Sequence, residues 1–99
     1  MHATPQFDVL CAGIVVADHV CSPIARMPAA GELVTAERLL LTLGGCAANT
    51  AVDLAKMGVR TAIAGRVGDD LLGRVVADML GDARVDTSAL HAISGEATS

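Results

Sequence analysis

The sequence predicts an α/β fold built on a parallel β-sheet, and three features of the 99-residue chain indicate it. Segments with strand character alternate with segments of helical periodicity, which is typical of βαβ units. The first strand candidate, residues 7–16, is almost continuously apolar, as expected for a strand that is buried on both faces. Hydrophobic residues make up 53% of the chain although Phe7 is its only aromatic residue, so we expect an aliphatic core.

The first half of the chain continues with an extended arm and a helix. Residues 20–30 contain two prolines, which exclude a helix interior and indicate an edge strand or an arm. Residues 33–43 form a further extended segment with apolar side chains on both faces. A helix with a face of small residues then begins after Gly45. It is expected to stop at Gly58, because glycine is favoured directly after a helix.

The second half repeats the order of strand, helix and strand. Residues 61–67 are a second buried strand candidate. Asp69 is placed as the N-cap of the following helix, and both Asp69 and Asp70 are expected to have a capping role in preference to a catalytic one. This helix is expected to end at Gly81. Residues 85–93 are a loop and the beginning of a strand. This sheet is unfinished, since its strands lack neighbours and one face and one edge have no covering element. We therefore expect a fragment, or a domain that needs more chain.

Charge and composition argue against several kinds of partner. The net charge of −4 disfavours nucleic acid and anionic membranes. No apolar run reaches the roughly 20 residues of a membrane-spanning helix, and the first residues lack the basic and apolar regions of a signal peptide. The three cysteines and three histidines show neither a disulfide framework nor metal-ligand spacing. We expect a reduced, cytoplasmic protein with no metal site in this segment.

The stretch from residue 43 to residue 51 carries the strongest functional signal. Gly44 and Gly45 allow close approach to the main chain, and the helix behind them begins with free N–H groups and partial positive charge. Such a seat suits hydroxyls or an anion. Asn49 stands one turn inside the helix, and Asp18 follows the first strand, where ligands bind in open α/β sheets. The structural alternatives are a plain turn, a solvated Asn and a solvated loop Asp.

With these features the sequence resembles the N-terminal third of the PfkB/ribokinase family of carbohydrate kinases. The family's first signature combines Gly-Gly, a small residue, an Asn, a second small residue and glycines at fixed spacing. It is matched without a gap by Gly44, Gly45, Ala47, Asn49, Ala51, Gly58 and Gly68. The resemblance covers about residues 7–99. Cys46 stands where ribokinases often carry Lys, and Val16 where they often carry Asn, which leaves the identity of the sugar open.

The resemblance implies a ribokinase-like, doubly wound α/β domain, incomplete here, with a small β-sheet lid and a sugar held between them. The lid strands would lie within about residues 20–43, with another starting near residue 89. Carried over by position, Asp18 and Asn49 would hydrogen-bond the sugar, and Gly44 and Gly45 would bring main-chain groups to it. A carboxylate suits paired hydroxyls because each hydroxyl can donate a charge-assisted bond to it.

The implied function is the sugar-binding portion of an ATP-dependent carbohydrate kinase. The family's second signature, Gly-Ala-Gly-Asp, supplies the catalytic base and the anion hole and lies beyond residue 99, as do the sites for ATP and Mg²⁺. We therefore expect no catalytic or cofactor-binding residue in this segment, which would be inactive alone. Lid sheets of the family often pair between subunits, which implies a homodimer through the lid.

Two other functions have different signatures. A dinucleotide-binding module needs Gly-x-Gly-x-x-Gly directly after the first strand, where only Gly13 is present. A non-catalytic assembly or regulatory module with the same fold is the second alternative. A Gly-Ala-Gly-Asp segment downstream would decide between this module and the kinase.

Overall fold

The computed structural model describes residues 6–99. The sequence also predicts a disordered lead-in over residues 1–6, of which only Gln6 lies within the described residues. The elements follow one another in the order β1 (Val9–Ala12), β2 (Val16–Cys21), β3 (Leu39–Gly44), α1 (Cys46–Lys56), β4 (Thr61–Gly68), α2 (Leu71–Asp82) and β5 (Asp86–Ile93).

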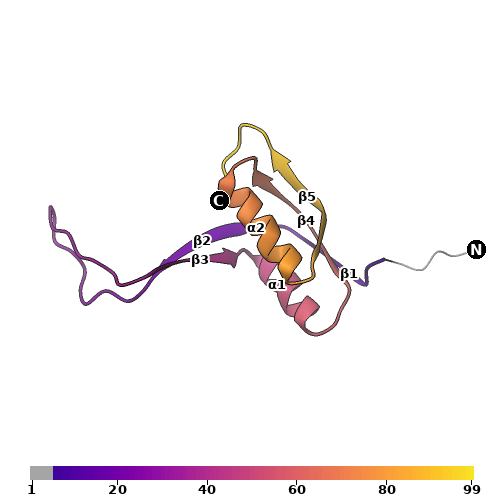
Figure 1. Cartoon of the computed structure of the whole chain (residues 1–99), viewed down its shortest axis with the longest axis horizontal. Helices are drawn as coiled ribbons and strands as arrows, with labels where there is room; N and C mark the ends of the chain where they lie inside the picture. Colours follow the sequence, from indigo (N-terminus) through magenta and orange to yellow (C-terminus); the bar gives the residue numbers. More distant parts are fainter. Residues whose placement is uncertain (1–5) are drawn as a thin grey trace, which may run out of the picture.

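The main sheet consists of β1, β4 and β5, which run parallel with β4 in the middle (Figure 1). Helix α1 contacts β1 and β4, and α2 contacts β4 and β5. Because both crossovers step in the same direction and such crossovers are right-handed, the two helices pack on the same face of the sheet. The α/β class with a parallel sheet is therefore confirmed.

The core lies between this face and the helices and is aliphatic, as the composition predicts. Ile63 on β4 and Val76 and Leu80 on α2 have no exposed surface. Ala48 and Ala51 are also fully buried, and their small side chains let α1 approach the sheet closely. The remaining members of the buried cluster are Cys11, Val15, Ala17, Ala47, Val67 and Val85.

The opposite face of the main sheet has no covering element among residues 6–99. Leu10 on β1 is 60% exposed, whereas the next residue, Cys11, faces the helices and is 6% exposed. Strands β1 and β5 form the two edges of the sheet. The bare face and edges that the sequence predicts are therefore present. Within the described residues, neither helix has the length and apolar character needed to span a lipid bilayer.

Strands β2 and β3 form a second, antiparallel sheet that projects from the body as a long hairpin (Figure 1). We call residues 16–44 the lid hairpin. The prediction of one extended segment over residues 33–43 is wrong, because residues 22–38 form an irregular distal loop and only residues 39–44 are strand. The prolines and glycine of this loop interrupt strand pairing. Glu32 instead organises it, pairing with Arg26 and accepting the Ala29 N–H at 3.0 Å.

The apolar run over residues 7–16 does not form the single strand that its composition predicts. Strand β1 ends at Ala12, and Gly13 adopts a φ of 145°, which is accessible to glycine and strained for other residues. The Gly13 N–H still bonds the Ala64 carbonyl at 3.0 Å. The chain therefore leaves the main sheet at Gly13 and enters the lid hairpin at Val16.

The helix ends are close to the predicted positions, with two differences. Helix α1 ends at Lys56, and Gly58 adopts a φ of 85°, which confirms the predicted stop. Helix α2 is capped by Asp70 rather than Asp69, because it is the Asp70 carboxylate that accepts the Gly73 N–H at 2.8 Å. This helix also continues past Gly81 to Asp82.

The strand predicted to start near residue 89 begins at Asp86 and pairs in parallel with β4. It therefore belongs to the main sheet and not to the lid, which corrects the sequence-based assignment. The physical reason is the tight turn after α2, where Val85 is 3% exposed and its N–H bonds the Leu80 carbonyl at 3.0 Å. This turn returns the chain directly to the edge of β4.

Candidate functional site

The candidate site lies where the lid hairpin meets helix α1. Strand β3 runs into the helix through Gly45, which has a φ of 95° and no side-chain cap. A Cβ atom added to Gly45 would lie 2.4 Å from the carbonyl oxygen of Ile14, a main-chain atom that cannot move aside easily. The Ala47 N–H donates to the same oxygen at 3.2 Å. The first turn of α1 is thus docked on the segment that leaves β1.

Asp18 lies directly over Gly44. The register of the hairpin pairs Asp18 with Thr42 and Val16 with Gly44, so the Asp18 side chain and the Gly44 backbone share one face. A Cβ atom on Gly44 would lie 2.1 Å from Asp18 Oδ2 and 2.8 Å from its Cγ. The missing side chain of Gly44 is the space that the Asp18 carboxylate occupies.

The position of Asp18 differs from the sequence-based expectation in one respect. Asp18 is not in a loop after the first strand but inside β2, on the face of the hairpin opposite to Ala17. Ala17 is 7% exposed and belongs to the core, whereas Asp18 is exposed. Thr42 is exposed on the Asp18 face and is a site neighbour that sequence reasoning did not single out. The alternation of residues 39–43 is the signal that could have identified it.

Asn49 is placed one helical turn beyond Gly45. Its main-chain N–H donates to the Gly45 carbonyl at 2.9 Å, and the residue is exposed. Because an α-helix rises about 5.4 Å per turn, the Asn49 side chain belongs to the first turn of α1. The structure therefore brings Asp18, Gly44 and Gly45 into direct proximity and places Asn49 near them along the same helix.

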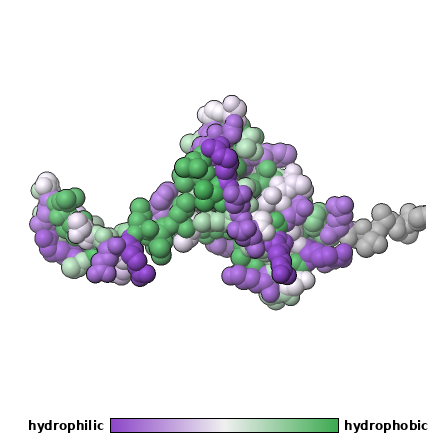
Figure 2. Space-filling view, viewed as in Figure 1, coloured by the Kyte–Doolittle hydropathy of each residue, from purple (hydrophilic) through white to green (hydrophobic). Residues whose placement is uncertain are grey.

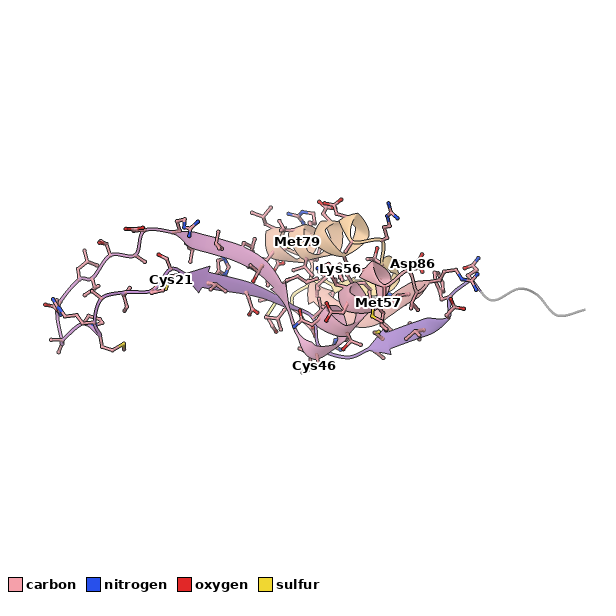
Figure 3. The ribbon with its side chains drawn as sticks, turned by 90° about the horizontal axis from the view of Figure 1, so that it is seen from below. Cys21, Cys46, Lys56, Met57, Met79 and Asp86 are labelled. Carbon is pink, nitrogen blue, oxygen red and sulfur yellow. The ribbon has the colours of Figure 1, made fainter. Side chains whose placement is uncertain are left out.

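A shallow hollow of about 350 Å³ lies beside this junction, on the other side of the α1 N-terminus. Its lining consists of β1 together with Cys46, Ala47 and Thr50, and it contains none of the four predicted site residues. Cys46 is exposed at the start of the helix, where β3 ends (Figure 3). The hollow lies along β1, an edge strand of the main sheet, and is separate from the Asp18 site.

The described residues offer no cluster of metal-binding side chains, and the N-terminus of α2 is occupied by side chains of this chain. No group of three or more His, Cys, Asp or Glu side chains among residues 6–99 could hold a metal ion. The N-terminus of α2, a potential phosphate seat, is filled by the Asp70 carboxylate and by Thr98. What the junction can offer a ligand is one exposed carboxylate, one exposed amide and a glycine main chain.

The chain is similar to known carbohydrate kinases. The family model described as pfkB family carbohydrate kinase matches residues 6–99. The ribokinase of Haemophilus influenzae is 32% identical over 87 residues, which are 87% of this chain and 28% of that protein. The fructokinase of Klebsiella pneumoniae is 39% identical over 62 residues, which are 63% of this chain and 20% of that protein.

Solved structures show the same similarity. The structure of Arabidopsis thaliana ribokinase complexed with ribose and ATP superimposes with a TM-score of 0.81 at 30% sequence identity. It covers 95% of this chain, which corresponds to 30% of the ribokinase chain. The chain thus spans less than a third of the length of these similar proteins.

Proposed function

This chain belongs to the pfkB family of carbohydrate kinases, and from this premise we propose that it is the N-terminal, sugar-binding portion of an ATP-dependent kinase. The proposed substrate is a sugar, or a sugar-like molecule, whose hydroxyl group receives the phosphoryl group. The observation that carries the proposal is the Asp18 carboxylate, which lies over Gly44 at the entrance to α1.

Each residue of the site has a role that its chemistry supports. Asp18 accepts hydrogen bonds from two neighbouring sugar hydroxyls, which are stronger than neutral bonds because the acceptor is charged. Asn49 both donates to and accepts from a hydroxyl. Gly44 and Gly45 keep side chains out of the space beside the main chain. Together these residues fix the orientation of the sugar, and phosphoryl transfer depends mainly on such positioning and on charge stabilisation.

ATP and Mg²⁺ are assigned to a part of the enzyme outside this chain. ATP supplies the phosphoryl group, and the structure similar to this chain that contains ribose also contains ATP. Among residues 6–99 no group of acidic side chains could hold Mg²⁺, and the α2 N-terminus is filled by the Asp70 carboxylate. We therefore assign binding of the sugar, and no catalytic step, to the residues of this chain.

The test of this function is a phosphorylation assay with the full-length kinase that contains this chain, ATP and a panel of sugars that includes ribose, fructose and deoxygluconate derivatives. ATP-dependent phosphorylation of at least one sugar is the expected result. Sugar binding without phosphoryl transfer, or assembly with another protein in the absence of any transfer, would instead favour the non-catalytic module with the same fold.

We further infer that the lid hairpin joins two subunits into a homodimer. Leu39 is 67% exposed and Leu40 50% exposed, on opposite faces of the same strand, and Val20 beside them is 49% exposed. Figure 2 shows hydrophobic surface along part of the hairpin. Such exposed apolar surface is typical of an interaction site.

The dimer is tested by replacing Leu39 and Leu40 with lysine. Leu41 is left unchanged because it packs against the core. The double variant is expected to be monomeric in size-exclusion chromatography with light scattering, since two charges would be desolvated at the interface. The matched control replaces Met57 and Leu71 with lysine. These residues are 76% and 68% exposed and lie outside the lid hairpin, so this control should leave the dimer intact. A dimer that survives the hairpin substitutions would contradict this interface.

A further inference from the structure

Asp70 accepts more hydrogen bonds than the capping of α2 requires. Its Oδ1 accepts the Gly73 N–H at 2.8 Å, which is the cap. The Thr98 hydroxyl donates to the same oxygen at 2.6 Å, and the Thr98 main-chain N–H donates to Oδ2 at 2.8 Å. These bonds lower the pKa of the Asp70 carboxyl, and the bond from the Thr98 hydroxyl has the largest effect.

The Thr98 hydroxyl both donates and accepts a hydrogen bond at this position. Its hydroxyl oxygen also accepts the Gly68 N–H at 2.9 Å. The segment around it packs directly on glycine backbone, since a Cβ atom on Gly68 would lie 2.3 Å from the Glu96 carbonyl oxygen. A Cβ atom on Gly73 would lie 3.0 Å from the Thr98 hydroxyl oxygen. Residues 96–98 are therefore held against the β4–α2 junction by close contact as well as by hydrogen bonds.

The residue after Thr98 connects this junction to the lid hairpin. The Ser99 main-chain oxygen accepts the Ala17 N–H at 2.7 Å. Ala17 lies in β2, is 7% exposed, and immediately precedes Asp18. A continuous series of hydrogen bonds thus runs from Asp70 through Thr98 and Ser99 to the strand that carries the Asp18 carboxylate.

We propose that Asp70 is a positioning residue that holds β2, and with it Asp18, in place through Thr98 and Ser99. Asp70 itself belongs to the N-terminus of α2 and does not belong to the Asp18 site. The consequence for sugar binding rests on the function proposed above, whereas the mechanical link to β2 does not depend on it.

The experiment uses Thr98→Val, which removes the hydroxyl at nearly constant shape, and Thr98→Ser, which keeps it. Asp70→Ser retains a capping oxygen for α2 but is too short for the Thr98 bonds. Asp69→Ser is the matched control, because the Asp69 side chain forms a long, exposed ion pair with Arg74. Amide hydrogen exchange is measured over β2 and β4, and KM is measured for the sugar and for ATP.

In Thr98→Val and Asp70→Ser, amide exchange in β2 is expected to be about tenfold faster, because both variants lose hydrogen bonds to a charged carboxylate. Exchange in β4 should change little, the KM for sugar should rise about three- to tenfold, and the KM for ATP should stay constant. Thr98→Ser and Asp69→Ser should behave like the unchanged protein.

Three results would overturn the proposal. The first is that amide exchange in β2 is unchanged in Thr98→Val. The second is that exchange becomes faster to the same extent throughout the protein. The third is that exchange in β2 becomes faster while the KM for the sugar stays unchanged. If the unchanged protein phosphorylates no sugar, the proposed function fails, and the exchange of β2 alone then decides whether Asp70 holds this strand.

Discussion

Replacing Gly45 with valine is expected to abolish the folded protein. The φ of 95° at this residue costs a non-glycine residue on the order of 1–3 kcal/mol. A Cβ atom there would also lie 2.4 Å from the Ile14 carbonyl oxygen, which receives the Ala47 N–H. From the sequence alone this substitution is expected to fill the sugar site. The structure shows that the added side chain meets the β1–β2 connection, so the damage falls on the docking of α1.

Two matched controls separate the effect of backbone strain at Gly45 from the effect of the clash with the Ile14 carbonyl oxygen. Gly58 has a φ of 85° but nothing within 4 Å of an added Cβ, so Gly58→Val tests backbone strain alone. Gly81 lies in α2 with open space around it and an ordinary helical φ, so Gly81→Val tests neither. Circular dichroism and thermal melting should show Gly81→Val as the most stable of the three variants, Gly58→Val as less stable, and Gly45→Val as the least stable. A cooperative melt of Gly45→Val at the normal temperature would contradict the docking described here.

Replacing Asp18 with alanine is expected to lower kcat/KM for the sugar about ten- to a hundredfold, with no loss of stability. Removal of hydrogen bonds to a charged acceptor costs about 1.5–3 kcal/mol, and this energy converts to that range of rates. Asn49→Ala should cost less, because an amide forms neutral bonds. The KM for ATP should not change in either variant. The assay is initial-rate kinetics with the protein and the sugar that it phosphorylates best.

Gly44→Ala provides an independent test of the same carboxylate. The added methyl group would lie 2.1 Å from Asp18 Oδ2 and must displace the carboxylate, while the strand backbone at Gly44 needs no left-handed conformation. We expect a loss similar to that of Asp18→Ala, and little further loss when the two substitutions are combined. If both single variants retain normal sugar kinetics while folded, Asp18 is a solvated residue of the hairpin and not a sugar ligand.

The lowered pKa values at the surface belong to structural contacts. The Arg60 guanidinium lowers the pKa of Asp8 and the Arg26 guanidinium lowers that of Glu32, in both cases mainly by hydrogen bonding. Both pairs are exposed, and exposed pairs contribute little to stability. The site carboxylate, Asp18, is distinguished by its position over Gly44.

Local signals in the sequence are sufficient for the α/β class, for the helix α1 with its glycine at each end, and for the strand β4. These signals are the period of apolar residues and the conformational freedom of Gly45 and Gly58, which involve only residues that are neighbours in the chain. The Gly-Gly-x-x-x-Asn pattern is likewise contiguous. The resemblance to the family can therefore be read from the order of the residues alone.

Contacts between residues far apart in the chain account for what the sequence does not predict. The apolar run over residues 7–16 is divided because Gly13 leaves the main sheet for the lid hairpin. Asp70 rather than Asp69 caps α2, and Thr98 joins it from the end of a different segment. Two adjacent aspartates look alike in sequence. Only folding shows which of them meets Thr98, because hydrogen bonds across 28 positions leave no periodic signal.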